Sequence, residues 1–254
     1  PASVRRLIDS GAASDIGRPI ANLSFAIDYM IGGLTPRQFL TTNLIIHLFC
    51  AALAFLLARQ IGLFVGAPAT PIALFSTAAW SLHPYNLSAV LYAVQRMTSL
   101  AALFSLAALT VYVMARRRIV LSWSMTALGI LLVGALSLTG LLCKETAALV
   151  PLFIAAFELT IGRTCRQTND STQQRAWIWC CGFLPSLLLC AYLLWKIPAF
   201  AHAHEYRPFS LTERLLSEGR ILWVYLGQLL APTNATMSLF HDDFVPSESL
   251  FRPM

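Results

Sequence analysis

The feature that most constrains this chain is its long stretches without any charged residue. Residues 97–115, 119–143 and 176–195 contain no Asp, Glu, Lys or Arg, and residues 39–58 form a fourth such stretch, closed by Arg59. A helix needs about 20 mainly apolar residues to cross the hydrocarbon core of a bilayer. The composition agrees, because 57% of the 254 residues are hydrophobic and only 12% are charged, against about 25% charged in soluble domains. We therefore predict an integral membrane protein.

Further windows extend this prediction. Residues 146–162 carry a single charge, Glu158, and a second apolar stretch runs from about residue 68 to His83-Pro84. Proline should break or kink a helix there, because it lacks an N–H group and clashes with the preceding turn. Counting residues 215–231 as a possible last span, we expect an all-α, polytopic transmembrane helical bundle of about six or seven spans.

These windows divide the chain into three parts. Residues 1–38 are expected to be the tail of an outer loop, and residues 39–196 the transmembrane helical core. Residues 197–254 are expected to combine an outer loop with an interfacial or seventh helix. The first fifteen residues hold no apolar run of the kind found in a signal peptide. We interpret both ends, Pro1 and Met254, as cut.

The positions of the basic residues predict the orientation. Arg116–Arg118 form one short loop, and a second loop at 163–175 holds three arginines against Asp170. Loops rich in Lys and Arg remain in the cytoplasm, so residues 1–38, 83–96 and 144–145 should share the opposite face. The net charge of +6 is thereby explained by membrane topology, and nucleic acid is not expected as a partner.

Ionisable residues other than these topological charges gather at the outer boundary. Charged groups in or next to hydrocarbon are costly, and they often mark a site. In the alternative interpretation, Arg96 and Lys144 only extend their charged ends to the interface. Asn43 and His47 share one helix face and are expected to link helices. The outer-boundary group consists of Arg18, Asp28, His83, Arg96, Lys144 and Glu145.

Several segments in this region resemble a known family. They are GRPIANLSFAIDY at 17–29, TNLIIHL at 42–48, HPYNLSAVLYAVQRMTSL at 83–100 and KETAALVP at 144–151. Their order and spacing resemble the C-type membrane glycosyltransferases related to the transmembrane and tetratricopeptide-repeat O-mannosyltransferases and their bacterial homologues. Whether a tetratricopeptide-repeat domain follows residue 254 stays open.

The resemblance implies a helical membrane enzyme that takes a sugar from a polyprenyl-phosphate donor. The acceptor would be a protein or a glycan on the non-cytoplasmic face, with a bacterial inner membrane and its periplasm as the expected location. In such enzymes an acidic residue of the first outer loop serves as general base. Asp9 and Asp15 are the only acids before Arg18, and neither is paired with a second acid, so the catalytic acid is expected upstream of Pro1.

The cations have a physical role in such a reaction. Arg or Lys at a helix end can donate charge-assisted hydrogen bonds to a lipid phosphate, and the same contacts stabilise the charge that grows as the sugar leaves. Arg96 and Lys144 are the first candidates, followed by Arg18. His83 either donates to the phosphate or sugar or caps the turn before Pro84, and Glu145 either tunes Lys144 or ties down a neighbouring helix.

The HDDF segment at 241–244 is the other candidate constellation. His241 and Asp242 could contact acceptor or donor, but one histidine beside paired acids is a weak metal signal, since a site usually needs about three protein ligands. We assign no metal or other cofactor and leave a divalent ion open. The six cysteines show no CxxC spacing and are interpreted as lipid-facing or packing residues.

Two other functions compete with the transferase. A transporter or flippase for a lipid-linked or amphipathic substrate would place ionisable groups near the bilayer midplane on broken helices. In this chain the spans are nearly free of charge and the charges lie at one face, which favours chemistry at the surface. A sugar polymerase or ligase would share the donor and differ in the acceptor, and long outer loops would favour it.

Overall fold

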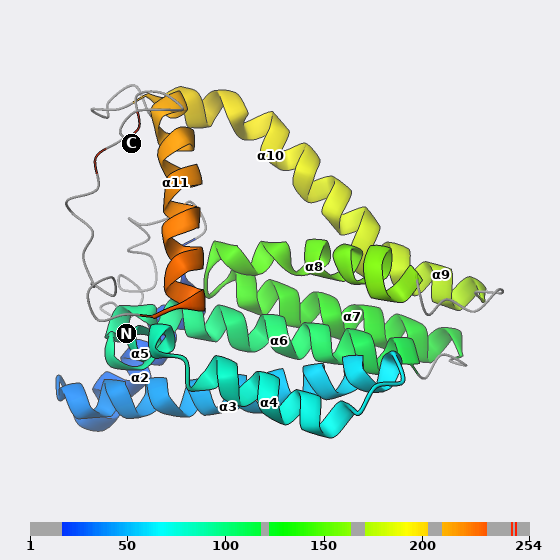
Figure 1. Cartoon of the computed structure of the whole chain (residues 1–254), viewed down its shortest axis with the longest axis horizontal. Helices are drawn as coiled ribbons and strands as arrows, with labels where there is room; N and C mark the ends of the chain where they lie inside the picture. Colours follow the sequence, from blue (N-terminus) through cyan, green and yellow to red (C-terminus); the bar gives the residue numbers. More distant parts are fainter. Residues whose placement is uncertain are drawn as a thin grey trace. The chain divides into compact units, whose positions relative to one another are not determined.

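The computed structural model describes residues 17–117, 122–163, 171–202, 210–232, 245 and 247. Every element of regular structure among them is helical, so the predicted all-α class is confirmed. The chain forms two units, residues 1–189 and 190–254, and the division falls within one long helix. Each unit is considered by itself (Figure 1).

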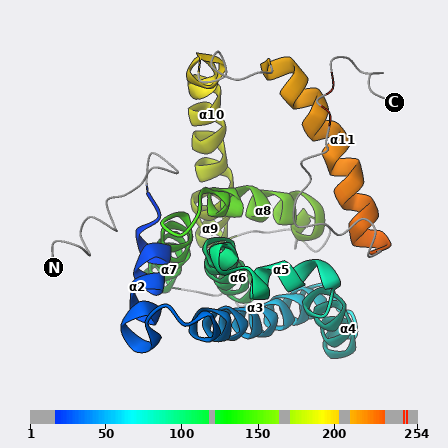
Figure 2. The same cartoon turned by 90° about the vertical axis from the view of Figure 1, so that its left-hand side faces the viewer.

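The first unit is built around α6 (Arg96–Arg117). Helices α3 (Pro36–Phe64), α7 (Trp123–Leu141) and α8 (Val150–Phe157) all pack against it. Figure 2 shows α6 nearly end-on, with the other three helices beside it. Helix α8 continues through a π-helical turn, η4 (Glu158–Gly162). A second such turn, η5 (Trp179–Phe183), lies between α9 (Thr172–Ile178) and α10 (Leu184–His202) and packs against α8.

Within the described residues, five helical segments are long and apolar enough to cross a membrane, in agreement with five of the seven predicted windows. The sixth window forms α4 (Ala69–Ser81), whose 13 residues would reach only about 20 Å at 1.5 Å per residue. The seventh forms α11 (Leu211–Leu230), which is not among the five. The five segments are Pro36–Phe64, Ala93–Arg117, Trp123–Leu141, Glu145–Gly162 and Thr172–Pro198.

Short elements connect these helices at the end of the first unit where α6 begins. Helix α2 (Pro19–Gly32) precedes α3. Between α4 and α6 the chain forms the 3-10 turn η1 (Pro84–Asn86), the short helix α5 (Leu87–Leu91) and the 3-10 turn η2 (Ala93–Gln95). A third 3-10 turn, η3 (Glu145–Leu149), joins α7 to α8. Thus the helix breaks predicted at Pro84 and near Lys144 are confirmed.

The core of the first unit depends on aromatic stacking and close helix approach. Tyr112 and Trp177 are fully buried and stack with their ring centroids 5.4 Å apart. A Cβ atom added at Gly129 would lie 2.6 Å from the Trp177 ring, and one at Gly62 would lie 2.8 Å from the Ala69 Cα. Small residues at such contacts let membrane helices approach each other closely.

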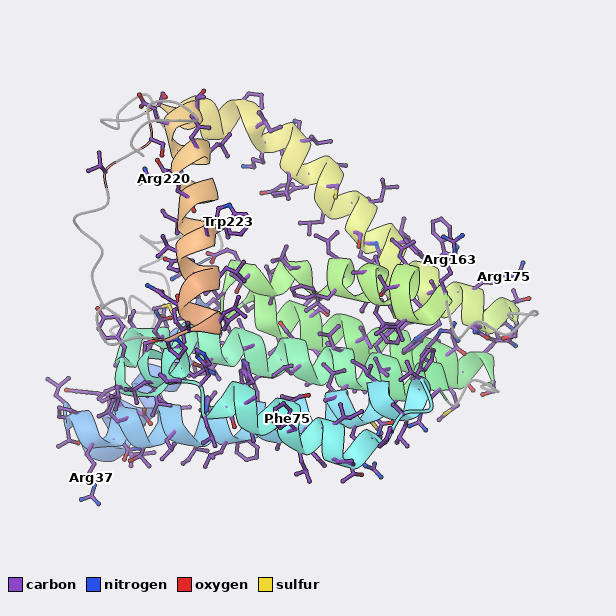
Figure 3. The ribbon with its side chains drawn as sticks, viewed as in Figure 1. Arg37, Phe75, Arg163, Arg175, Arg220 and Trp223 are labelled. Atoms are coloured by element: carbon purple, nitrogen blue, oxygen red, sulfur yellow. The ribbon has the colours of Figure 1, made fainter. Side chains whose placement is uncertain are left out.

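The outer surface of the helices is apolar, as expected if lipid surrounds them. Phe75 on α4 is 78% exposed and Leu131 on α7 is 70% exposed. Figure 3 shows Phe75 on the outside of the first unit. Soluble proteins rarely expose large contiguous apolar surfaces, so this surface supports the membrane assignment.

In the second unit, α11 begins with a capping box. The Ser210 side chain accepts a hydrogen bond from the Glu213 N–H, and the Ser210 N–H donates to the Glu213 carboxylate at 2.7 Å. These bonds satisfy backbone donors that a helix start leaves free. Arg220 then donates to the Val245 carbonyl and the Ser247 hydroxyl, which ties the later segment to α11.

Candidate functional site

Five of the predicted site residues meet around the first turn of α6, namely Arg18, Asp28, Arg96, Lys144 and Glu145. Three consecutive residues there, Arg96, Met97 and Thr98, each contact a different part of the chain. Arg96 contacts α2 and α3. The Met97 sulfur accepts a hydrogen bond from Arg18, and the Thr98 hydroxyl accepts one from Lys144. We call this end of the first unit the site end.

Arg96 is the centre of a buried network. Its guanidinium is fully buried and lies 2.6 Å from the Asp28 carboxylate, an ion-pair contact rather than an aligned hydrogen bond. Its Nε donates to Asn43 Oδ1 at 2.8 Å, and its two terminal nitrogens donate to the carbonyls of Ser24 at 3.2 Å and Phe39 at 2.8 Å. Arg96 therefore does not extend to the interface, which contradicts the alternative interpretation for this residue.

Aromatic rings and amides complete the surroundings of this ion pair. The Arg96 guanidinium carbon lies 4.5 Å from the Phe25 ring centroid, a cation–π contact. Asp28 also accepts hydrogen bonds from Thr42 at 2.7 Å and from Gln38 at 3.2 Å. A buried charge is tolerated only when it is paired and hydrogen-bonded, and here both charges are. The network fixes α2 and α3 against α6.

Asn43 and His47 link helices, as predicted. Besides accepting from Arg96, Asn43 donates to the carbonyls of Val90 and Tyr92 at 3.3 and 3.4 Å. His47 Nε2 lies 3.0 Å from the Ser81 carbonyl oxygen, and its ring stacks on Trp80. Asn43 thus joins α3 to the connection that leads into α6, and His47 joins α3 to α4.

A half-buried layer of charge lies beside the buried network. Arg18 forms an ion pair with Glu145 at 3.2 Å and approaches the Met97 sulfur at the same distance. Lys144 donates to the Thr98 hydroxyl at 2.7 Å. Burial lowers the pKa of the Lys144 ammonium below its ordinary value, the Arg18 charge lowers it further, and Glu145 opposes the shift. Two cations and one carboxylate therefore share this layer.

His83 has the structural role that was one of its two interpretations. Its Nδ1 accepts a hydrogen bond from the Tyr85 N–H at 3.2 Å and so caps the turn that starts at Pro84. The segment HDDF, with His241 and Asp242, lies outside the described residues. Among the described side chains, no three of His, Cys, Asp and Glu are grouped as metal ligands.

The opposite end of α6 holds a second buried network that the sequence interpretation missed. Arg116, expected to be only a topological charge, donates to Glu158 at 2.9 Å, and each side chain is 6% exposed. Tyr112 also donates to Glu158, at 2.8 Å, and Arg117 donates to Gln60. The sequence feature that could have predicted this network was Glu158, the single acid of an otherwise apolar window.

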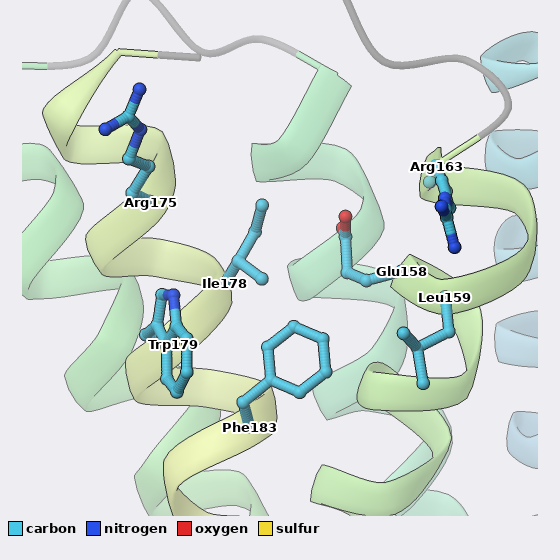
Figure 4. A pocket seen from close by; sticks show the side chains of 8 residues that line it. Glu158, Leu159, Arg163, Arg175, Ile178, Trp179 and Phe183 are labelled. Atoms are coloured by element: carbon cyan, nitrogen blue, oxygen red, sulfur yellow. The ribbon is translucent and has the colours of Figure 1, made fainter.

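A pocket adjoins this second network. It has a volume of about 370 Å³, and Figure 4 shows Glu158 between Arg163 on one side and Arg175 on the other. Trp179 and Phe183 lie below them in the same view. The pocket is lined by Glu158, Leu159, Gly162, Arg163, Arg175, Ile178, Trp179 and Phe183.

The comparison with known proteins gives one informative relative. The chain is 33% identical over 141 residues to a protein described as Protein O-mannosyl-transferase Tmtc1 from Drosophila melanogaster. The match covers 56% of this chain and 15% of that protein. No family model matches the chain, and no solved structure does. The five apolar helices together with this relative support a multi-pass integral membrane protein, distantly related to the family of that mannosyl-transferase.

Proposed function

We propose that this protein is a membrane glycosyltransferase that moves a sugar from a polyprenyl-phosphate-linked donor to a protein or glycan acceptor. The observation that carries the proposal is the layer at the first turn of α6. There Arg18 and Lys144 are half-buried and held in place by Met97, Thr98 and Glu145. The distant relation to a mannosyl-transferase supports the same class of reaction.

The two cations would act on the donor phosphate. A lipid phosphate places its anion near headgroup depth, where half-buried Lys and Arg side chains can donate charge-assisted hydrogen bonds to it. As the bond to the sugar breaks, negative charge grows on the phosphate, so the cations stabilise the transition state more than the bound donor. Partial burial strengthens this effect, because the local dielectric is lower than that of water.

Arg96 has a different immediate task in this proposal. Its guanidinium is fully buried, and its hydrogen bonds go to Asn43 and to two backbone carbonyls. Direct contact between Arg96 and the donor stays a prediction. The contacts support a positioning role, in which Arg96 and Asp28 fix α2, which follows Arg18, against α6, whose Thr98 holds Lys144.

The relative suggests the first substrates to test. Its description names an O-mannosyl-transferase that acts on protein, so we propose mannose as the sugar and a protein hydroxyl as the acceptor. The general base is not assigned within this layer, because Asp28 is paired with Arg96 and Glu145 with Arg18.

The proposed sidedness places the site end outside the cytoplasm. The structure groups Arg116, Arg117 and Glu158 at the end of α6 opposite to Lys144, and the arginine-rich end is expected to remain inside. A cysteine at position 117 or 144, in a cysteine-free background, can be labelled with a membrane-impermeant reagent from either side. We expect position 144 to react from the outside and position 117 only from the inside, and the reverse pattern would refute the sidedness.

The transfer assay uses reconstituted protein with a polyprenyl-phosphate mannose donor and a Ser- and Thr-containing acceptor peptide. Lys144→Ala and Arg18→Ala should each reduce transfer at least about 100-fold, since removal of one preorganised donor typically costs this much. Arg37→Ala is the matched control, because Arg37 is an exposed arginine at the start of α3. Wild-type transfer rates in both site variants, with folding matched, would refute the donor-phosphate role.

A transporter is the competing class of protein. The positions of the charged side chains among the described residues do not favour it. The buried ion pairs involve Arg96 at the first residue of α6 and Arg116 near its last. Transporters place such groups near the bilayer midplane on discontinuous helices. In the described residues, the buried ion pairs lie instead at the ends of the spanning helices.

A further inference from the structure

The pocket at the Arg116 end of α6 is not used by the proposed transferase. Its two arginines come from different segments, Arg163 from the residue after η4 and Arg175 from α9. In Figure 4 they lie on opposite sides of the pocket. Because η4 and α9 belong to separate spans, an anion between the arginines would bridge two helices.

The charge in this pocket is unbalanced. The Glu158 carboxylate already accepts hydrogen bonds from Arg116 and Tyr112. Neither the Arg163 nor the Arg175 side chain has a hydrogen-bond or ion-pair partner within the part of the chain that the structure describes. Gly162 contributes to this arrangement, because a Cβ atom there would lie 2.5 Å from Glu158 Oε2. The glycine thus lets the carboxylate fold back toward the helix, next to Arg116.

The rest of the pocket is apolar. Leu159 and Trp179 are 58% and 59% exposed, and both belong to segments apolar enough to span a membrane. Arg163 directly follows one of these segments, and Arg175 lies near the start of the other. The arginines therefore lie at headgroup depth, and the apolar wall continues from them into the depth of the acyl chains.

We propose that this pocket binds an anionic phospholipid, whose phosphate lies between Arg163 and Arg175 and whose acyl chain packs on Leu159, Trp179 and Phe183. Arginine suits this role because its planar guanidinium can donate two hydrogen bonds to one phosphate. Basic pockets between membrane helices are known to bind lipid headgroups of this kind. A free phosphate would satisfy the arginines but leave the apolar wall uncovered, so a lipid is the better match.

The test measures thermal unfolding of the detergent-solubilised full chain during titration with a short-chain phosphatidylglycerol. We expect a saturable rise of the unfolding midpoint, because a ligand that binds only the folded state stabilises it. The zwitterionic phosphatidylcholine of the same chain length should give no saturable rise. Inorganic phosphate at the same concentration should give a much smaller one.

Variants locate the effect. Arg163→Gln combined with Arg175→Gln should raise the phosphatidylglycerol concentration at half-saturation at least about tenfold. This change corresponds to a loss of about 1.4 kcal/mol of binding free energy. The control variant Arg37→Gln, which replaces an exposed arginine at the site end, should leave this concentration unchanged. Trp179→Ala should weaken the binding of phosphatidylglycerol but not that of inorganic phosphate.

Three results would overturn the proposal. They are equal responses to both lipids, an unchanged half-saturation in the double variant, and inorganic phosphate binding as tightly as phosphatidylglycerol. If the double variant is poorly folded, the lipid retained by wild type and by Arg175→Lys in native mass spectrometry gives a second readout. Selective retention of the anionic lipid supports the site, and indiscriminate retention refutes it. Sugar transfer is not measured, so failure here leaves the proposed function untouched.

Discussion

The two ends of α6 carry ion pairs of the same type in different surroundings. Arg96 and Asp28 are 0% and 4% exposed, and Arg116 and Glu158 are each 6% exposed. Beside the first pair lie Arg18 and Lys144, which have partners within the site end. Beside the second pair lie Arg163 and Arg175, whose side chains have no such partner among the described residues.

This difference shows that burial of an ion pair does not by itself identify the groups that take part in the proposed transfer reaction. The two pairs perform the same task, since each joins a neighbouring segment to α6. Replacing one partner of such a pair is costly because it leaves an uncompensated buried charge. The proposed functions reside instead in the cations beside each pair, which are half-buried at the site end (Arg18 and Lys144) and exposed at the other end (Arg163 and Arg175).

The largest expected effect is that of Arg96→Ala on stability. The variant should lower the free energy of unfolding by about 3–5 kcal/mol, because Asp28 becomes a buried carboxylate without its cation. Denaturant titration in detergent micelles, compared with Arg37→Ala, measures this loss. Arg96→Met combined with Asp28→Leu should be less harmful than Arg96→Ala alone. A loss below about 1 kcal/mol for Arg96→Ala would show that the pair is not a structural anchor.

A smaller effect is expected at the opposite end of α6. Arg116→Ala should cost about 2–3 kcal/mol, less than the full penalty for a broken buried pair, because Tyr112 still donates to Glu158. Arg117→Ala should cost about 0.5–1.5 kcal/mol, the value of one hydrogen bond. Transfer per folded molecule should be unchanged in both variants. If Arg116→Ala is folded but inactive, the division between the two ends is wrong.

The smallest expected effect is a shift in the pH profile of transfer. Burial and Arg18 lower the pKa of Lys144, and Glu145 raises it. Because only the charged ammonium stabilises the leaving phosphate, activity should fall on the alkaline side as Lys144 loses its proton. Arg18→Gln removes a charge that lowers the pKa, so its residual activity should persist to higher pH. Glu145→Gln should move the loss of activity at high pH to lower pH. If both variants shifted the pH profile in the same direction, the role assigned to the Lys144 ammonium would be contradicted.

The membrane helices could be predicted because their signal is local. An uncharged run such as 97–115 is apolar whatever it packs against, and the breaks at Pro84 and near Lys144 follow from residues at those positions. The candidate site was predictable in part, because Arg18, Arg96 and Lys144 stand out as charges beside apolar runs.

The pairings across helices could not be predicted in the same way. Asp28 meets Arg96, and Glu158 meets Arg116, only after separate helices have packed together. The π-helical turns η4 and η5 add to the difficulty, because such a turn changes which side chains share a face with those before it. Thr98 is a further example, since its contact with Lys144 depends on the position of the α7–η3 connection.

The placement of two buried arginines near the ends of one helix has a consequence for the bilayer itself. Twenty residues separate Arg96 from Arg116, which corresponds to about 30 Å along an α-helix. This equals the hydrocarbon thickness of a typical membrane. We therefore expect α6 to fit a bilayer of about this hydrocarbon thickness, in which both ion pairs lie at headgroup depth. A thinner bilayer would have to be met by helix tilt and a thicker one by local thinning, each at a cost in hydrophobic mismatch.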